Sequence, residues 1–109
     1  MTTRAKAASN KPGIRVVIID DDDFEREFVV DLLKTAGQFN VSSMSSVFGL
    51  TNHLINEHVE VVVLDVMMPS IRGDKLATLL RKSPALAKLG VGLISSLPET
   101  ELAPLMAEV

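Results

Sequence analysis

Several classes of protein are excluded by what this chain of 109 residues lacks. It contains no cysteine, so neither a disulfide framework nor a thiolate metal site can form. No apolar run approaches the roughly 20 residues that span a bilayer, and residues 1–13 lack the apolar segment of a secretory signal. Basic charge is also scarce, because the net charge is −3, which argues against a nucleic-acid or anionic-membrane surface. We therefore expect a cytoplasmic protein with no direct nucleic-acid or membrane partner.

The residues that are present suit a single packed domain. Hydrophobic residues make up 47% of the chain, which is enough to form a core in a protein of this length. Residues 1–13 are small, polar and basic, so we expect a flexible leader there, followed by one domain over 14–109. There is no internal repeat, and no low-complexity segment outside the leader.

Two β-branched apolar runs, each ended by acids, organise the chain. Residues 14–19 run directly into Asp20, and residues 59–64 run into Asp65. Runs with little alternation are typical of strands buried on both faces, as in a parallel sheet. Pro69 and Gly73 then follow the second run and force a turn, because neither residue extends a strand.

Helical and strand patterns alternate along the rest of the chain. The patterns predict helices over 23–36, from a cap at Ser45 or Ser46 to about 58, over 74–82, and from Pro98 onward with a kink at Pro104. Weaker strands are expected over 39–41 and 89–94. This alternation of strand and helix predicts an α/β fold, a doubly wound parallel sheet with helices on both faces.

Carboxylates are expected to meet at one edge of this sheet. The ends of the first and third strands are neighbours in such a fold, so Asp20, Asp21 and Asp65 would share one pocket. Carboxylates at close quarters repel each other unless a cation intervenes, and Mg²⁺ suits an open site with oxygen ligands. The plain alternative is that Asp65 merely caps the loop after its strand. For Asp22 and Asp23, we expect only a solvated helix start that favours the helix dipole.

A hydroxyl and a metal beside these acids point to one kind of chemistry. Ser95 follows the strand over 89–94 and would lie at the same edge of the sheet. Carboxylates, a hydroxyl and Mg²⁺, without a histidine or cysteine base, suit phosphoryl transfer, in which positioning and charge neutralisation do most of the work. Asp65 would be the nucleophile and would form an acyl phosphate.

Three segments of the chain resemble the receiver domain of two-component response regulators, the CheY-like superfamily. The segment VVIIDDDDFERE is similar to the opening of that domain. The segment VVVLDVMMPSIRG is similar to its phospho-acceptor strand and loop, and VGLISS is similar to its fourth strand. Together they account for nearly the whole chain after Gly13. The resemblance implies a flavodoxin-like fold with strand order 2-1-3-4-5, and a signalling switch that is not an enzyme in the usual sense.

The resemblance also implies a role for each matching residue. Asp65 matches the phosphorylated aspartate, and its donor would be a phosphohistidine on a sensor histidine kinase or phosphotransfer protein. Asp21 matches the direct Mg²⁺ ligand of the acidic pair, and Asp20 the member that acts partly through water. The backbone carbonyl of Met67 would complete the metal site, while Ser95 matches the switch hydroxyl that moves toward the phosphoryl group.

The chain departs from the family pattern at two places. Arg72 stands where an acid commonly precedes the glycine, and we expect this to be a surface detail. The family continues with a fifth strand that bears a lysine, and with a fifth helix, whereas no lysine follows Ser95 and the sequence stops at Val109. We therefore expect a fragment of a longer protein, or completion by association such as a dimer through the fourth strand, with apolar surface left bare beside the first helix.

Two other functions remain open for such a sequence. One is a receiver-like interaction module whose output, through an unknown effector, does not depend on phosphorylation; the acids speak against it and the absent lysine speaks for it. The other is a small Mg²⁺-dependent phosphatase that uses an aspartyl phosphate. Such enzymes usually place an acid two residues after the nucleophile, and Met67, which stands there, cannot transfer a proton.

Overall fold

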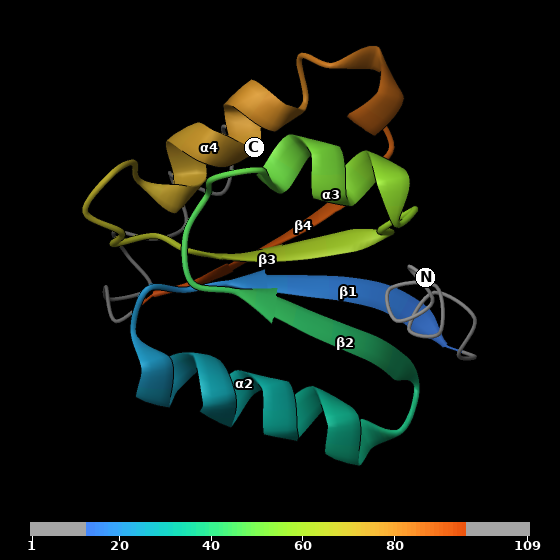
Figure 1. Cartoon of the computed structure of the whole chain (residues 1–109), viewed down its shortest axis with the longest axis vertical. Helices are drawn as coiled ribbons and strands as arrows, with labels where there is room; N and C mark the ends of the chain where they lie inside the picture. The colour runs from blue at the N-terminus through green and yellow to red at the C-terminus, as the bar shows by residue number, and fades with distance from the viewer. Residues whose placement is uncertain (1–12, 96–109) are drawn as a thin grey trace.

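A computed structural model describes residues 13–95 of the chain (Figure 1). In chain order its elements are β1 (Ile14–Ile19), α2 (Asp23–Ala36), β2 (Phe39–Met44), α3 (Leu50–Asn56), β3 (Val61–Asp65), α4 (Gly73–Leu80), the short 3-10 helix η1 (Pro84–Leu86) and β4 (Gly90–Ile94). The leader up to residue 12, and the helix expected after Pro98 with its kink at Pro104, lie outside the described residues.

All the described strands form one parallel sheet in the order β2-β1-β3-β4. Helix α2 covers one face of this sheet, and α3 and α4 cover the other (Figure 1). The prediction of an α/β fold with helices on both faces is confirmed, as is the order 2-1-3-4 for these strands. No helix in this part of the chain combines the length and the apolar character that crossing a membrane requires.

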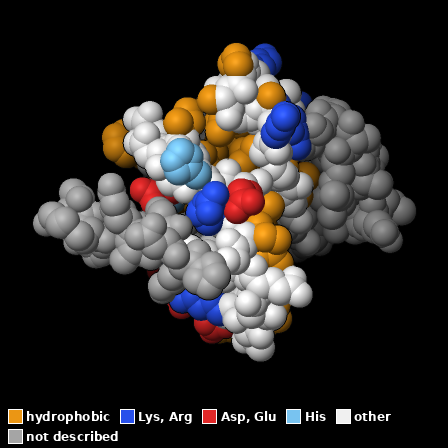
Figure 2. Space-filling model, turned by 90° about the vertical axis from the view of Figure 1, so that its right-hand side faces the viewer, with side chains coloured by type: hydrophobic (Ala, Val, Ile, Leu, Met, Phe, Trp, Pro, Cys, Tyr) orange, Lys and Arg blue, Asp and Glu red, His pale blue; other side chains and the backbone are white. Residues whose placement is uncertain are grey.

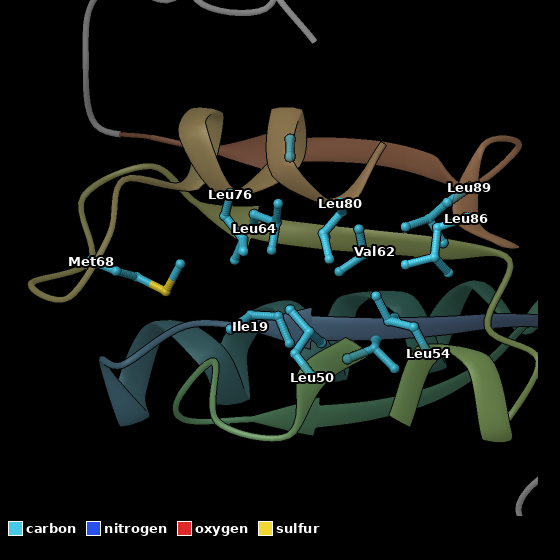
Figure 3. Packing of buried hydrophobic residues seen from close by; sticks show 12 residues of the cluster. Ile19, Leu50, Leu54, Val62, Leu64, Met68, Leu76, Leu80, Leu86 and Leu89 are labelled. Carbon is cyan, nitrogen blue, oxygen red and sulfur yellow. The ribbon is translucent and has the colours of Figure 1, made fainter. Parts of the chain in front are cut away.

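The larger part of the core lies between the sheet and the pair α3 and α4 (Figure 3). Alternate residues of a strand point to opposite faces, so Val62 and Leu64 of β3 face this core, where Leu54 of α3 and Leu80 of α4 meet them. Burying a side chain of this size contributes about 1.5–3 kcal/mol. The other face carries a smaller buried group beneath α2, formed by Val16, Ile18 and Val30.

Both ends of α2 lie where the sequence predicts them. Asp22 caps its start by accepting a hydrogen bond from the backbone N–H of Glu25 at 3.0 Å. Gly37 ends it in the left-handed conformation at φ 80°, which glycine adopts without steric cost. These ends are predictable because each depends on one local residue type.

The apolar stripe predicted on α2 faces the core only in part. Val30 is buried, but Phe24, Phe28 and Leu32 are 84%, 59% and 55% exposed. These three residues recur every fourth position, so they lie along one side of the helix. We call them the α2 stripe. The bare apolar surface expected from the sequence lies on the sheet face beside this helix, so the α2 stripe is a separate feature.

Two element boundaries differ from the prediction. Strand β2 runs on to Met44, because it pairs with β1 from Phe39 through to the end of that strand. Helix α3 begins only at Leu50, after Gly49 in the left-handed conformation, so neither Ser45 nor Ser46 caps it. The side chain of Ser46 instead accepts a local hydrogen bond from the N–H of Phe48.

Candidate functional site

Asp20 and Asp65 lie side by side at the carboxyl ends of adjacent strands. Ile19 of β1 pairs with Leu64 of β3. Asp20 directly follows Ile19, and Asp65 directly follows Leu64. Asp20 is fully buried and Asp65 is 7% exposed. Burying an ionised carboxylate is costly unless a partner neutralises it, so two at one point demand an explanation.

A third acid, Glu25, joins them from the first turn of α2. Each of Asp20, Glu25 and Asp65 offers a carboxylate oxygen, and these atoms all lie within 4.8 Å of one another. We call these residues the acidic group. Sequence reasoning missed Glu25. Its place in the first turn of α2 could be predicted from the sequence, but its approach to Asp20 and Asp65 depends on how the helix packs on the sheet.

The oxygens of the acidic group are only partly satisfied. Asp20 accepts a hydrogen bond through Oδ1 from the N–H of Asp22 at 2.9 Å, and Asp65 accepts one through Oδ1 from the N–H of Met67 at 3.0 Å. Oδ2 of Asp20 is buried and has no hydrogen-bond partner within the described residues. A buried oxygen of this kind, surrounded by further carboxylates, is suited to a cation.

The pKa values of both strand acids reflect this crowding. Burial raises the pKa of Asp20 to about 6, and the neighbouring Glu25 carboxyl adds to the effect. Burial also raises the pKa of Asp65; the N–H of Met67 opposes the shift and the charge of Asp20 adds to it. In both residues the ionised form is disfavoured until positive charge arrives.

The other predicted site residues, Asp21, Met67 and Ser95, lie at the same edge of the sheet but outside the acidic group. Asp21 is exposed and is not a member of the group, although its charge contributes to the raised pKa of Asp65. Met67 is 57% exposed and follows Asp65 by two residues. Ser95 directly follows β4, whose Ile94 pairs with Asp65 and accepts a hydrogen bond from the N–H of Val66 at 2.9 Å. The structure thus brings Ser95 to the same edge of the sheet.

Gly73 allows the loop after Asp65 to fold back onto the acceptor strand. The N–H of Gly73 donates to the carbonyl of Val66 at 3.0 Å. A Cβ added to Gly73 would overlap the carbonyl oxygen of Asp65 and lie 2.8 Å from the carbonyl carbon. Only glycine permits this approach without a shift of the backbone.

Arg26 joins α2 to the end of β1. Its Nη1 donates to the backbone carbonyl of Asp20 at 2.8 Å, and its Nη2 pairs with the carboxylate of Asp23. The arginine therefore binds the backbone of Asp20 and leaves its carboxylate to other partners. Sequence reasoning gave Arg26 no role, since nothing in the pattern shows which way its side chain turns.

Arg72 lies at the surface, with its side chain 47% exposed, and it also pairs with a buried acid. Its Nε lies 3.1 Å from Oδ1 of Asp74, whose side chain is only 2% exposed. A buried carboxylate needs such a partner, so the pair holds the turn between Asp65 and α4. The sequence does not show this pairing, because it does not show that Asp74 is buried.

The opposite edge of the sheet carries different chemistry. Seen from the amino ends of the strands, hydrophobic side chains gather there beside a small group of charged ones (Figure 2). A shallow hollow of about 440 Å³ is lined by Val59, Glu60, Ala85, Leu86, Lys88 and Leu89. Arg15 pairs with Glu60 at 3.7 Å, and Lys88 adds a second basic side chain at the hollow. This edge therefore carries basic and apolar side chains around a single acid, whereas acids gather at the carboxyl edge.

A parallel α/β domain with buried acids at the carboxyl edge of its sheet has the architecture of a receiver domain. The family model for the response regulator receiver domain matches residues 16–104, and the chain belongs to this family. This confirms the resemblance seen in the sequence. Domains of this family generally serve in two-component signalling and partner with histidine kinases.

The curated relatives include proteins of very different length. Over 82 residues the chain is 34% identical to the two-component response regulator ORR8 of Oryza sativa subsp. indica, a match that covers 74% of this chain and 67% of that protein. Over 90 residues it is 32% identical to protein-glutamate methylesterase/protein-glutamine glutaminase 3 of Rhodopseudomonas palustris. The match covers 82% of this chain but only 24% of that protein, and the chain spans 12% of the gliding motility regulatory protein of Myxococcus xanthus.

Solved structures agree with the fold. A putative response regulator from Chloroflexus aurantiacus superposes with a TM-score of 0.77 at 22% identity, covering 90% of this chain and 80% of that chain. The chemotaxis protein CheY4 of Vibrio cholerae superposes with a TM-score of 0.75 at 18% identity, covering 88% and 80% respectively. At such identities the likeness concerns the fold.

Proposed function

We propose that this domain accepts a phosphoryl group on Asp65 from a sensor histidine kinase or phosphotransfer protein and acts as a signalling switch. One observation carries the proposal: Asp65, 7% exposed at the end of β3, lies within 4.8 Å of two further carboxylates. Membership of the receiver family supports it. In the transfer, an Asp65 carboxylate oxygen bonds to phosphorus, the phosphorus–nitrogen bond of the donor phosphohistidine breaks, and the freed imidazole takes a proton from solvent.

The residues present fit a Mg²⁺ ion. The buried and unpartnered Oδ2 of Asp20 and the oxygen-only donor set are what a hard divalent cation requires. Asp20, Asp65, the adjacent Asp21 and the backbone carbonyl of Met67 would hold it. A bound Mg²⁺ neutralises carboxylate charge and orients phosphoryl oxygens.

The chain's own groups would then form the switch. The N–H of Met67, which donates to Asp65 at 3.0 Å, holds the acceptor carboxylate in place. The hydroxyl of Ser95 would donate to a phosphoryl oxygen and draw the end of β4 toward Asp65. Such a movement biases the loop and helix that follow, which is how a local modification becomes a signal. We place this activity in the cytoplasm, with an output partner other than nucleic acid or membrane.

A second function is favoured by the surface of α2. The α2 stripe exposes Phe24, Phe28 and Leu32, which is the kind of apolar surface that marks a protein contact. In this alternative the domain is a receiver-like interaction module whose output does not depend on phosphorylation. Association through the free side of β4, which pairs only with β3 among the described strands, belongs to the same proposal.

Intact-mass analysis after incubation with a small-molecule phosphodonor tests the first function. Mg²⁺ should lead to the addition of one phosphate to the wild type and none to Asp65→Asn, while Asp31→Asn, an exposed acid on α2, keeps the modification. A wild type that binds Mg²⁺ yet gains no phosphate would favour the interaction module instead.

A further inference from the structure

The acidic group contains one carboxylate that the family resemblance did not supply. Glu25 comes from α2, whereas Asp20 and Asp65 end β1 and β3. We propose that Glu25 is a further cation ligand, so that the Mg²⁺ site is built from α2 as well as from the two strands. This inference rests on the proposed function of the site, because it names an additional residue toward the same ion.

Two contacts fix the first turn of α2, which carries Glu25, at the end of β1. Its N–H donates to Oδ1 of Asp22 at 3.0 Å, which sets the start of α2. The next residue, Arg26, donates from Nη1 to the carbonyl of Asp20 at 2.8 Å and ties the first turn to the end of β1. Together these contacts hold the first turn of α2 against the end of β1. From that turn the side chain of Glu25 brings a carboxylate oxygen within 4.8 Å of those of Asp20 and Asp65.

An independent observation indicates that something binds among these acids. Asp20 is fully buried, and its Oδ2 has no partner in the described part of the chain. An oxygen in that position costs free energy unless a ligand satisfies it. Because the carboxylates of Glu25 and Asp65 lie beside this oxygen, a cation is the ligand that both satisfies it and relieves the repulsion among the three acids.

Glu25 adds a further carboxylate to the site. Asp20, Asp21 and Asp65 together carry one negative charge more than Mg²⁺ balances, and Glu25 raises that excess to two. The excess strengthens attraction for the cation, and it also faces the phosphoryl group that Asp65 would carry. Glu25 thus raises cation affinity while opposing the negative charge of the phosphorylated state.

Isothermal titration calorimetry with Mg²⁺ tests this role on the full chain. Glu25→Gln should raise the dissociation constant for Mg²⁺ roughly tenfold, since it replaces a charged ligand by a neutral side chain of similar size. Glu27→Gln is the matched control, because Glu27 is an exposed acid on the same helix outside the acidic group. Glu25→Asp keeps the charge and should fall between wild type and Glu25→Gln. Far-UV circular dichroism confirms that each variant is folded.

The outcomes separate this inference from the proposed function. Equal Mg²⁺ affinity in the wild type and in Glu25→Gln overturns the role of Glu25 and leaves phosphorylation of Asp65 untouched. An equal loss in Glu27→Gln overturns it too, since the effect would then reflect general charge. At saturating Mg²⁺, Glu25→Gln should gain phosphate at least as completely as the wild type, and a lower yield contradicts the excess-charge argument.

Discussion

Asp20 is the residue at which burial and chemistry oppose each other most directly. It is fully buried beside two carboxylates, and its pKa is raised to about 6 from an ordinary value of 3.8. The native state therefore binds this proton more tightly than the unfolded chain does. A raised pKa at a buried acid is a common property of functional sites, where the fold accepts a cost that a ligand removes.

The stability of the cation-free protein should consequently depend on pH. The stabilising contribution of protonated Asp20 is fully present below pH 3.8 and is lost as the pH rises through about 6. As the pH rises through this window, the unfolding free energy of the wild type should fall by up to about 3 kcal/mol because Asp20 ionises. Asp20→Asn has no ionising group at position 20 and should not show this fall. Urea unfolding in EDTA, followed by far-UV circular dichroism because the chain has no Trp or Tyr, measures this. Parallel pH profiles for the two proteins would contradict it.

Gly73 provides a second test at the scale of one residue. Gly73→Ala would force its Cβ against the backbone of Asp65, so we expect a loss of about 1–3 kcal/mol in unfolding free energy and a large loss of phosphate acceptance. Gly37→Ala is the control, since its added Cβ meets nothing within 4 Å and only its left-handed φ is strained. Normal phosphorylation of Gly73→Ala would show that the loop adapts.

At the scale of elements, the boundaries that the sequence predicts well are those set locally. Asp22 and Gly37 delimit α2 because a cap and a left-handed glycine need only their neighbours. The start of α3 was misplaced because Ser46 resembles a cap, whereas pairing with β1 extends β2 through Met44. The sequence shows a cap by residue type but does not show how far a neighbouring strand will pair.

The candidate site also combines residues that the sequence predicts with residues that only tertiary placement reveals. The strand-end acids Asp20 and Asp65 were predictable, because parallel strands align their carboxyl ends. The approach of Glu25 to the strand acids and the pairing of Arg72 with Asp74 were missed, because both depend on how a helix or loop is placed in three dimensions. What depends on tertiary placement is what sequence reasoning could not supply.

The cap of α2 is an element whose contribution can be measured. Asp22→Ala removes the acceptor for the N–H of Glu25, so the free energy of unfolding should fall by about 1 kcal/mol. Asp22→Asn, which keeps a capping oxygen, should recover most of that loss. Thermal unfolding by circular dichroism gives both values, and equal melting temperatures for Asp22→Ala and the wild type would contradict the role of the cap.

At the scale of the whole molecule, the α2 stripe groups three of the exposed large apolar side chains of the described residues on one helix. Phe24, Phe28 and Leu32 expose apolar side chains on the helix that also brings Glu25 to the acidic group. One helix thus carries both an acid of the candidate site and an exposed apolar surface.

Self-association should depend on the α2 stripe. Phe24→Ser combined with Phe28→Ser should lower the weight-average mass measured by sedimentation at high concentration, because it removes exposed apolar area. Phe48→Ser is the matched control, since Phe48 is 89% exposed but lies outside α2. The same sedimentation behaviour in all three proteins would exclude the stripe as a contact surface.

The most direct measurement is to locate the phosphoryl group itself. After phosphorylation in the presence of Mg²⁺, reduction with borohydride converts an aspartyl phosphate into homoserine, which peptide mass spectrometry assigns to a position. We predict homoserine at position 65 and unmodified aspartate at Asp20 and Asp21. Homoserine at another acid, or none in a protein that has gained phosphate, would contradict the account of Asp65 as the acceptor.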